Sequence, residues 1–228
     1  MPTKYTKYEI ATVIAVFFHL IGLLGILFFN RDFFVGLTSF NLLLSFALLI
    51  WTHKKISIPF VIFVLLVIAV GFGAEVIGVN TKLLFGDYTY GNALGIKWLQ
   101  VPLLIGINWF IIIYCCGICI HTLLMKAINR VAADSNQPPH ALRAISVIID
   151  GASMAVAFDW LMEPVAVKLG FWTWNGDIPM YNYICWFVLC VLMLTFFQLL
   201  NHEKQNKFAV NLLLIQGMFF LILRSFLQ

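Results

Sequence analysis

Residues 58–79 read IPFVIFVLLVIAVGFGAEVIGV, and Glu75 is the only charged side chain in this run. A helix of about 20 apolar residues spans the hydrocarbon core of a bilayer, so this stretch predicts a transmembrane helix. The sequence therefore predicts an all-α integral membrane protein, a single domain over residues 1–228 built as a bundle of seven transmembrane helices. The other six apolar runs cover residues 8–29, 34–51, 98–120, 142–162, 181–200 and 208–227.

The composition of the whole chain agrees with this prediction. The chain is 62% hydrophobic and 11% charged, with a mean hydropathy of +0.97. An ordinary soluble domain is about 25% charged, so there are too few polar side chains here to cover a water-exposed globule. The net charge of +4 is small and dispersed, which argues against a nucleic-acid partner. The first run is long enough to span and lacks a clear small-residue cleavage site, so no cleavable signal peptide is expected.

The basic residues favour one orientation in the cell membrane. Cytoplasmic loops of multi-pass proteins carry an excess of Lys and Arg. We therefore expect a cytoplasmic N-terminus, because nine basic residues lie on the N-terminal side and five on the other. The nine are Lys4, Lys7, Lys54, Lys55, Lys126, Arg130, Arg143, Lys204 and Lys207, and the five are Arg31, Lys82, Lys97, Lys168 and Arg224.

Apart from Glu9 at the start of the first run, four carboxyl side chains lie within an apolar run or directly after one: Glu75, Asp150, Asp159 and Glu163. A carboxylate at membrane depth costs several kcal/mol unless it is paired, hydrated or protonated. No Lys or Arg within the runs neutralises these groups, so we expect them to keep their protons near pH 7. A carboxyl group held neutral at this pH can serve as a general acid.

Helix geometry brings three of the four acids together. Asp159 and Glu163 are four residues apart and share one helix face, whereas Asp150 is about half a turn out of phase and is expected to be a buried packing residue. Glu163 precedes Pro164, which disfavours regular helix and predicts a helix end or kink there. Runs 58–79 and 142–162 cross in the same direction, so Glu75 reaches the same leaflet as the pair. The alternatives are an interfacial, hydrated Glu75 and a purely structural Asp159.

Two loop motifs on that same side repeat one pattern. Residues 86–92 read GDYTYGN and residues 170–177 read GFWTWNGD, each an aromatic-Thr-aromatic triplet beside Gly, Asn and Asp. In an extended segment Tyr88 and Tyr90 share one face, as do Trp172 and Trp174. We interpret the loops as aromatic lids over the acids, and pairing as a small β-ribbon is one way to build them. The alternative is a belt of aromatic anchors at the headgroup level.

Several classes of protein are excluded by the pattern. A retinal protein needs a lysine in the middle of its last helix, and residues 208–227 contain none. The five histidines are scattered, which does not suit a membrane di-iron oxygenase. The five cysteines lie in apolar runs and are expected to be packing residues, so no metal site is predicted. No glycine-rich nucleotide motif is present, and we expect no cofactor. Proton-coupled transport stays open, because intramembrane acids also serve transporters.

The acids and aromatic loops carry a family resemblance over roughly residues 71–190. The chain resembles the membrane carotenoid biosynthesis protein family that contains the bacterioruberin-type and γ-carotene-type carotenoid 1,2-hydratases. The first matching block is Glu75-x-x-Gly78, Phe85-Gly86-x-Tyr88-x-Tyr90, Leu94-Gly95, Val101-Pro102 and Trp109. The second is Asp159-x-x-x-Glu163-Pro164-x-Ala166, Gly170-x-Trp172-x-Trp174, Pro179, Asn182 and Trp186.

This resemblance implies addition of water to the terminal C1–C2 double bond of an acyclic carotenoid without a redox cofactor. Glu163 or Glu75 would donate the proton, and Asp159 would position water or accept its proton. Aromatic faces favour cations and would steady the carbocation. The alternatives are an end-group cyclase that uses the same protonation, and a non-catalytic carotenoid-binding or transport protein. The expected partners are a carotenoid, water and membrane lipid, and the residues expected to bind substrate are Tyr88, Tyr90, Trp109, Trp172, Trp174, Asn182 and Trp186.

Overall fold

The computed structural model describes residues 5–131 and 138–227. Within these residues, seven helical segments are long and apolar enough to cross a membrane, which confirms the predicted all-α membrane bundle. The short α2 and the longer α3 form the second of these segments together. The helices are α1 (Lys7–Phe28), α2 (Arg31–Gly36), α3 (Thr38–Thr52), α4 (Ile58–Thr81), α5 (Leu104–Val131), α6 (His140–Lys168), α7 (Met180–Leu199) and α8 (Lys207–Phe226).

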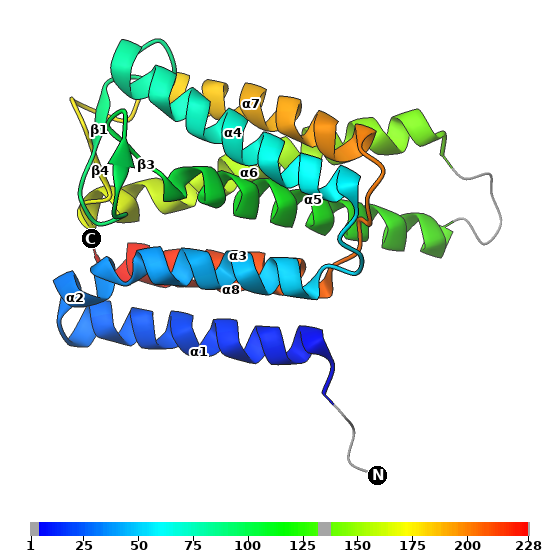
Figure 1. Ribbon diagram of the computed structural model, residues 1–228, viewed down its shortest axis with the longest axis horizontal. Helices are drawn as coiled ribbons and strands as arrows, with labels where there is room; N and C mark the ends of the chain where they lie inside the picture. Colours follow the sequence, from blue (N-terminus) through cyan, green and yellow to red (C-terminus); the bar gives the residue numbers. More distant parts are fainter. Residues whose placement is uncertain (1–4, 132–137, 228) are drawn as a thin grey trace.

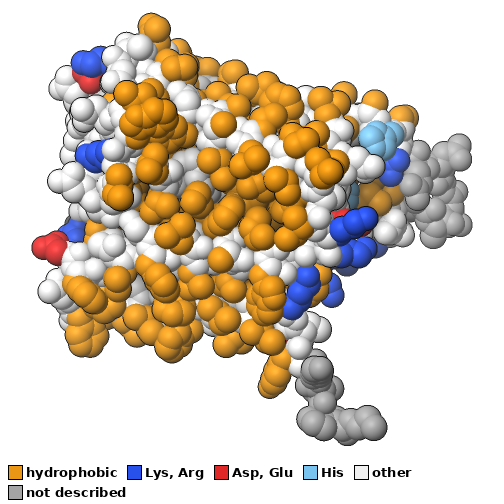
Figure 2. All heavy atoms as spheres, viewed as in Figure 1, with side chains coloured by type: hydrophobic (Ala, Val, Ile, Leu, Met, Phe, Trp, Pro, Cys, Tyr) orange, Lys and Arg blue, Asp and Glu red, His pale blue; other side chains and the backbone are white. Residues whose placement is uncertain are grey.

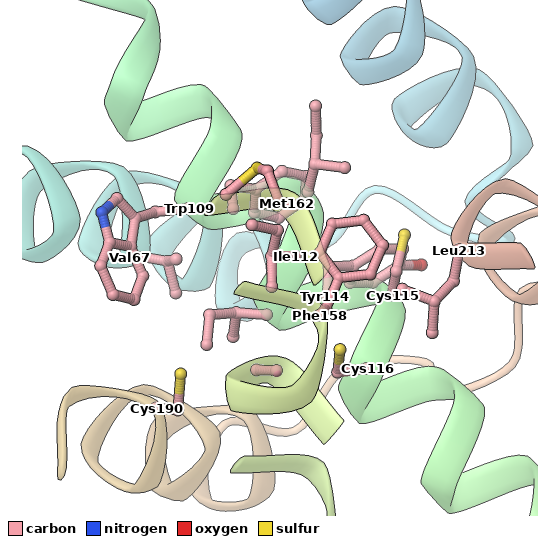
Figure 3. Close-up of a cluster of buried hydrophobic side chains, with 14 of the residues drawn as sticks. Val67, Trp109, Ile112, Tyr114, Cys115, Cys116, Phe158, Met162, Cys190 and Leu213 are labelled. Atoms are coloured by element: carbon pink, nitrogen blue, oxygen red, sulfur yellow. The ribbon is translucent and has the colours of Figure 1, made fainter. Parts of the chain in front are cut away.

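Helix α5 is the centre of the bundle. It packs against α3, α4, α6, α7 and α8, whereas α1 lies at the edge and packs on α8, α3 and α2 (Figure 1). Residues 109–118 of α5 are almost completely enclosed, and Figure 3 shows Ile112 and Tyr114 among buried side chains from neighbouring helices. All five cysteines are free and buried, as expected of packing residues.

The surface has the character of a membrane protein. Large apolar side chains such as Val13, Leu65 and Val188 are exposed along the flanks of the bundle. Figure 2 shows this apolar belt, with charged side chains gathered towards the two ends. A belt of this kind matches a hydrocarbon core between two polar boundaries. The protein is therefore a multi-pass membrane protein.

Both predicted boundaries of the helix over residues 98–120 are wrong. Helix α5 begins at Leu104 rather than at residue 98, because β2 (Lys97–Trp98) and β3 (Val101–Pro102) form a tight antiparallel hairpin before it. Its far end continues to Val131, well past residue 120. A helix satisfies its own backbone hydrogen bonds, so it can continue beyond the apolar run into the polar boundary.

Helix α6 also continues past its predicted end. Pro164 lies inside the helix, and Glu163 is therefore neither at a helix end nor beyond it. Proline has no N–H, so the carbonyl of Trp160, four residues earlier, loses its helical donor. Arg224 of α8 supplies a replacement, because its Nη1 donates to the Trp160 carbonyl oxygen at 3.0 Å.

The aromatic loops pair as a β-ribbon. Strand β1 (Tyr88–Tyr90) is antiparallel to β4 (Trp172–Trp174), with Tyr88 opposite Trp174 and Tyr90 opposite Trp172. The strands lie at one end of the bundle, here called the ribbon end (Figure 1). On the exposed face the hydroxyl oxygens of Thr89 and Thr173 are 3.1 Å apart. Alternation then turns the four aromatic side chains to the other face, towards the helices.

Candidate active site

Glu75 of α4 is held by three aromatic donors. The hydroxyls of Tyr88 and Tyr90 both donate to its Oε2, the latter at 2.8 Å. Trp109 of α5 donates from Nε1 to the other oxygen, Oε1, at 2.9 Å. A side chain at Gly71, one turn before Glu75, would collide with Trp109, so this glycine lets α4 and α5 approach closely enough for the contact.

Glu163 of α6 is held by the other strand of the ribbon. The indole N–H groups of Trp172 and Trp174 donate to its Oε2 at 2.9 Å and 3.1 Å. Its Oε1 makes no hydrogen bond within the described residues. Each strand of the ribbon thus serves one acid, β1 holding Glu75 and β4 holding Glu163.

Asp159 lies one helical turn before Glu163 and is 1% exposed. The side-chain amide of Asn182 in α7 donates to its Oδ2 at 3.1 Å. Its Oδ1 is buried and has no hydrogen-bond partner among residues 5–131 and 138–227. A buried carboxyl oxygen without a partner costs free energy, so Oδ1 marks the place where a further polar group would be stabilised.

The three acids open into one small cavity, here called the acid cavity, of about 20 Å³. Every site residue proposed from the sequence contributes to its wall, so the structure brings all ten together. Its lining residues are Glu75, Phe85, Tyr88, Tyr90, Ile105, Asn108, Trp109, Asp159, Met162, Glu163, Trp172, Trp174, Asn182 and Trp186.

Four of the lining residues were not foreseen: Phe85, Ile105, Asn108 and Met162. Asn108 carried a usable signal, because it is a polar side chain within an apolar run and precedes Trp109 directly. Phe85 belongs to the first block of the family resemblance, whereas nothing in the sequence separates Ile105 and Met162 from ordinary core residues. Asp150 lies elsewhere, as its helical phase predicts, but it is exposed on α6 and is not the buried packing residue expected.

Aromatic rings form the walls of the acid cavity in contacting pairs. Trp109 stacks on Trp186 of α7 with ring centroids 3.9 Å apart. Tyr88 contacts Trp174 across the ribbon at 5.0 Å. Such rings present negative π-faces that stabilise a cation without offering a nucleophile to attack it.

The polar groups around the acids are neutral hydrogen-bond donors. Burial raises the pKa of Tyr88 and of Tyr90 well above the usual value, so both phenols stay protonated and donate to Glu75. The salt bridges within the described chain are Lys54–Glu203 and Lys82–Asp87, and neither reaches the cavity. In the same residues, no three His, Cys, Asp or Glu side chains are placed to hold a metal ion.

Asp87 fixes the outer edge of the ribbon. Its carboxylate accepts from Lys82 at 2.6 Å and from the side-chain amide of Asn175 at 3.0 Å. The hydrogen bond from Lys82 is the main reason that the pKa of Asp87 is below its usual range. This pairing joins the loop after α4 to the loop after β4, and so holds the aromatic side chains over the acids.

The fold and the cavity define a multi-pass membrane protein with a carboxyl-lined aromatic chamber at one end. The profile of the carotenoid biosynthesis protein family matches residues 36–227, and the chain belongs to this family. This match is longer than the resemblance at residues 71–190, because it also includes α3 and α8. It begins after α1. No curated protein and no solved structure matches the chain.

Proposed function

We propose that the protein is a carotenoid 1,2-hydratase, which adds water to the terminal double bond of an acyclic carotenoid. The observation that carries this proposal is the convergence of the buried Glu75, Asp159 and Glu163 in one small, aromatic cavity. Family membership supports a role in carotenoid biosynthesis, and the choice of reaction rests on the chemistry of the cavity.

Glu163 is the best-placed proton donor. Its Oε2 accepts from two indoles, which leaves Oε1 to carry a proton towards the substrate. Glu75 uses both of its oxygens as acceptors and has none to spare. Transfer of the proton to C2 of the end group breaks the C1–C2 π bond and leaves a tertiary cation at C1, next to the π-faces of the cavity.

Asp159 is placed to handle the water. A cavity of about 20 Å³ has room for roughly one water molecule. The unpartnered Oδ1 of Asp159 would accept a hydrogen bond from that water and orient its oxygen towards C1. When the C–O bond forms, the water gives a proton to Oδ1 of Asp159, and the proton that Asp159 already holds passes to Glu163, one helical turn away. This relay leaves both carboxyl groups protonated again and balances the reaction.

The orientation of the chain belongs to the same proposal. The distribution of basic residues favours a ribbon end outside the cytoplasm, because cytoplasmic ends carry the excess of Lys and Arg. Water would then reach the acids from the ribbon end, and the carotenoid from the membrane. A carotenoid is about as long as the hydrocarbon core is thick, roughly 30 Å, so one end group can reach the acids while the rest stays in an apolar medium.

Product identity tests the proposal. The protein is expressed in a host that makes an acyclic carotenoid, and pigments are separated by chromatography and weighed by mass spectrometry. The hydratase yields a tertiary alcohol heavier than the substrate by one water per modified end. A product of unchanged mass but altered retention would instead indicate the cyclase. Pigment that co-purifies unchanged would indicate a binding or transport protein.

A further inference from the structure

Two further cavities lie near the acid cavity, one between α1, α2, α3 and α8 and the other between α1, α3, α5, α6 and α8. The larger, here called the entry cavity, measures about 330 Å³ and has the rings of Phe18, Phe34, Phe40 and Phe219 in its wall. It opens on the flank of the bundle, because its wall residues Ile21, Leu37 and Phe40 are 39%, 42% and 51% exposed. That flank belongs to the apolar belt, so the opening faces lipid.

The smaller of the two, here called the middle cavity, lies between the entry cavity and the acid cavity. It measures about 60 Å³ and shares His19, Thr38, Asn41 and Phe219 with the entry cavity. On its other side it shares Asn108 with the acid cavity.

Two chain neighbours of the site residues confirm how close the middle cavity is to the acids. Phe158 and Phe171 line the middle cavity, and they directly precede Asp159 and Trp172 of the acid cavity. The three cavities therefore form a row that leads from the lipid-facing flank to the carboxyl groups.

We propose that this row is the binding channel for the polyene chain of the substrate, which enters sideways from the membrane between α1 and α3. The inference rests on the proposed function and adds the route by which the substrate reaches the acids. On this route the polyene lies along the side of the bundle, in the half of the membrane next to the ribbon.

The walls suit this occupant. A polyene is narrow, rigid and apolar, and its conjugated system stacks on aromatic rings such as those of Phe18, Phe40 and Phe219. The few polar atoms in the wall are partly occupied with one another, since Asn41 Nδ2 lies 3.4 Å from His19 Nε2. A polar head group would find few partners to replace its hydration, whereas an apolar chain that arrives from lipid has no hydration to lose.

The acid cavity must widen before an end group can enter it from the middle cavity. The acid cavity holds about one water, which is less than a branched five-carbon end group needs. Met162 lies in its wall, and an unbranched thioether side chain changes shape more readily than a branched or aromatic one. Advance of the end group from the middle cavity therefore requires movement of side chains such as Met162.

Gly22 of α1 offers a test that leaves the acids untouched. It lines the entry cavity, and a Cβ built on it would meet Phe219 Cε2 at 3.8 Å, an ordinary contact. The Gly22→Phe variant therefore fills the entry cavity with a ring. Gly217→Phe is the matched control, because a Cβ at Gly217 of α8 meets nothing within 4 Å.

Binding is measured on purified protein in lipid nanodiscs, by the acyclic carotenoid retained after gel filtration. We expect Gly22→Phe to bind the carotenoid at least about tenfold more weakly than wild type, because the added ring overfills the channel. Gly217→Phe should bind as wild type. A short acyclic isoprenoid with the same end group should bind equally to all three proteins.

The proposed channel would be contradicted if Gly22→Phe and Gly217→Phe bound the carotenoid equally, whether both bound it as wild type or both failed to bind it. The proposal would also be overturned if a phospholipid acyl chain occupied the row of cavities and excess carotenoid did not displace it. Failure of the proposed function looks different. In that case the wild-type protein would bind the carotenoid, Gly22→Phe would still weaken the binding, and the carotenoid would be released chemically unchanged.

Discussion

At the scale of single residues, the acids in the cavity are oriented by neutral donors. Glu75 accepts from two phenols and an indole, and Glu163 accepts from two indoles. An arginine in their place would hold a carboxylate permanently ionised. The O–H of a phenol and the N–H of an indole fix the position of the carboxyl group and leave it able to exchange a proton. An acid catalyst requires both.

A different buried polar group, at the opposite end of the bundle, predicts how stability depends on pH. His53 stacks on Phe60, with ring centroids 3.6 Å apart, and its Nδ1 lies 2.7 Å from the hydroxyl of Tyr114. Burial lowers the pKa of His53 to about 4, and burial lowers that of the neighbouring His202 to about 4 as well.

Between pH of about 6.5 and about 4, the unfolded chain binds protons at these histidines that the folded chain does not, so stability falls as the pH falls. We expect thermal unfolding in detergent to shift to lower temperature over this window. His53→Gln should flatten the dependence, and His140→Gln, at an exposed histidine, should leave it unchanged. The same slope in wild type and His53→Gln would contradict the assignment.

Most of the lining of the acid cavity was predictable from the sequence, and the contacts between its residues were not. Seven of the ten candidates follow from acids in apolar runs and repeated aromatic triplets, which are rare patterns. The other three, Trp109, Asn182 and Trp186, came from the family resemblance. Which donor serves which acid depends on the register of β1 with β4, and that register is fixed by tertiary contacts. Asp150 shows the limit of the reasoning, since helical phase predicted its direction and failed to predict its exposure.

At the scale of elements, Pro164 shows how one helix depends on another. The Trp160 carbonyl that Pro164 leaves without a helical donor accepts from Arg224, whose guanidinium also lies over the Trp160 ring at 4.0 Å. This contact ties α6 to α8 close to Glu163. It also accounts for the error in the predicted helix end, because the rule for residues before proline takes no account of a donor from another helix.

A double-mutant cycle measures this contact. Arg224→Met should destabilise the wild-type protein by about 1 kcal/mol through the lost hydrogen bond. In a Pro164→Ala background the alanine N–H can donate to Trp160, so the same change should cost less. The stacking on Trp160 is lost in both backgrounds and cancels. Equal costs in thermal unfolding would contradict the account of Pro164.

The ribbon depends on a close backbone approach at Gly91. Its N–H donates to the carbonyl of Phe171 at 2.8 Å, and a Cβ there would collide with the carbonyl oxygen of Gly170. Gly91→Ala should therefore separate β1 from β4 and cost about 1–3 kcal/mol. Gly73→Ala, where a Cβ meets nothing within 4 Å, is the control.

The measurement for this pair is the fluorescence of the ribbon tryptophans together with thermal unfolding. Wild-type spectra and stability for Gly91→Ala would show that the ribbon tolerates the side chain.

Among the elements, the seven membrane helices were predictable from hydropathy alone. The β2–β3 hairpin was not, because Trp98 and Val101 are as apolar as the helix that follows them.

At the scale of the whole molecule, an odd number of crossings puts the two ends of the chain on opposite sides of the membrane. Lys7 at the start of α1 and Phe226 at the end of α8 lie at opposite ends of the bundle. We expect a reporter fused before α1 to be cytoplasmic and one fused after α8 to be external. Both reporters on one side would contradict seven spans, and a reversed pair would contradict the orientation alone.

The row of cavities is a property of the whole molecule that the sequence did not reveal. Its walls come from α1, α3, α5, α6 and α8, so it exists only when these helices are packed together. Each wall residue taken alone is an ordinary apolar or weakly polar residue of a membrane helix. The acids were visible from the sequence because they are exceptions to membrane composition.

The central claim is that the carboxyl groups of Asp159 and Glu163 in α6 perform acid catalysis on a carotenoid end group. The most direct test is the rate of water addition to an acyclic carotenoid by purified protein in nanodiscs. Glu163→Gln and Asp159→Asn should slow it by about a hundredfold or more, whereas Glu203→Gln, at a surface acid paired with Lys54, should not. Hydration at the wild-type rate by both cavity variants would contradict the claim.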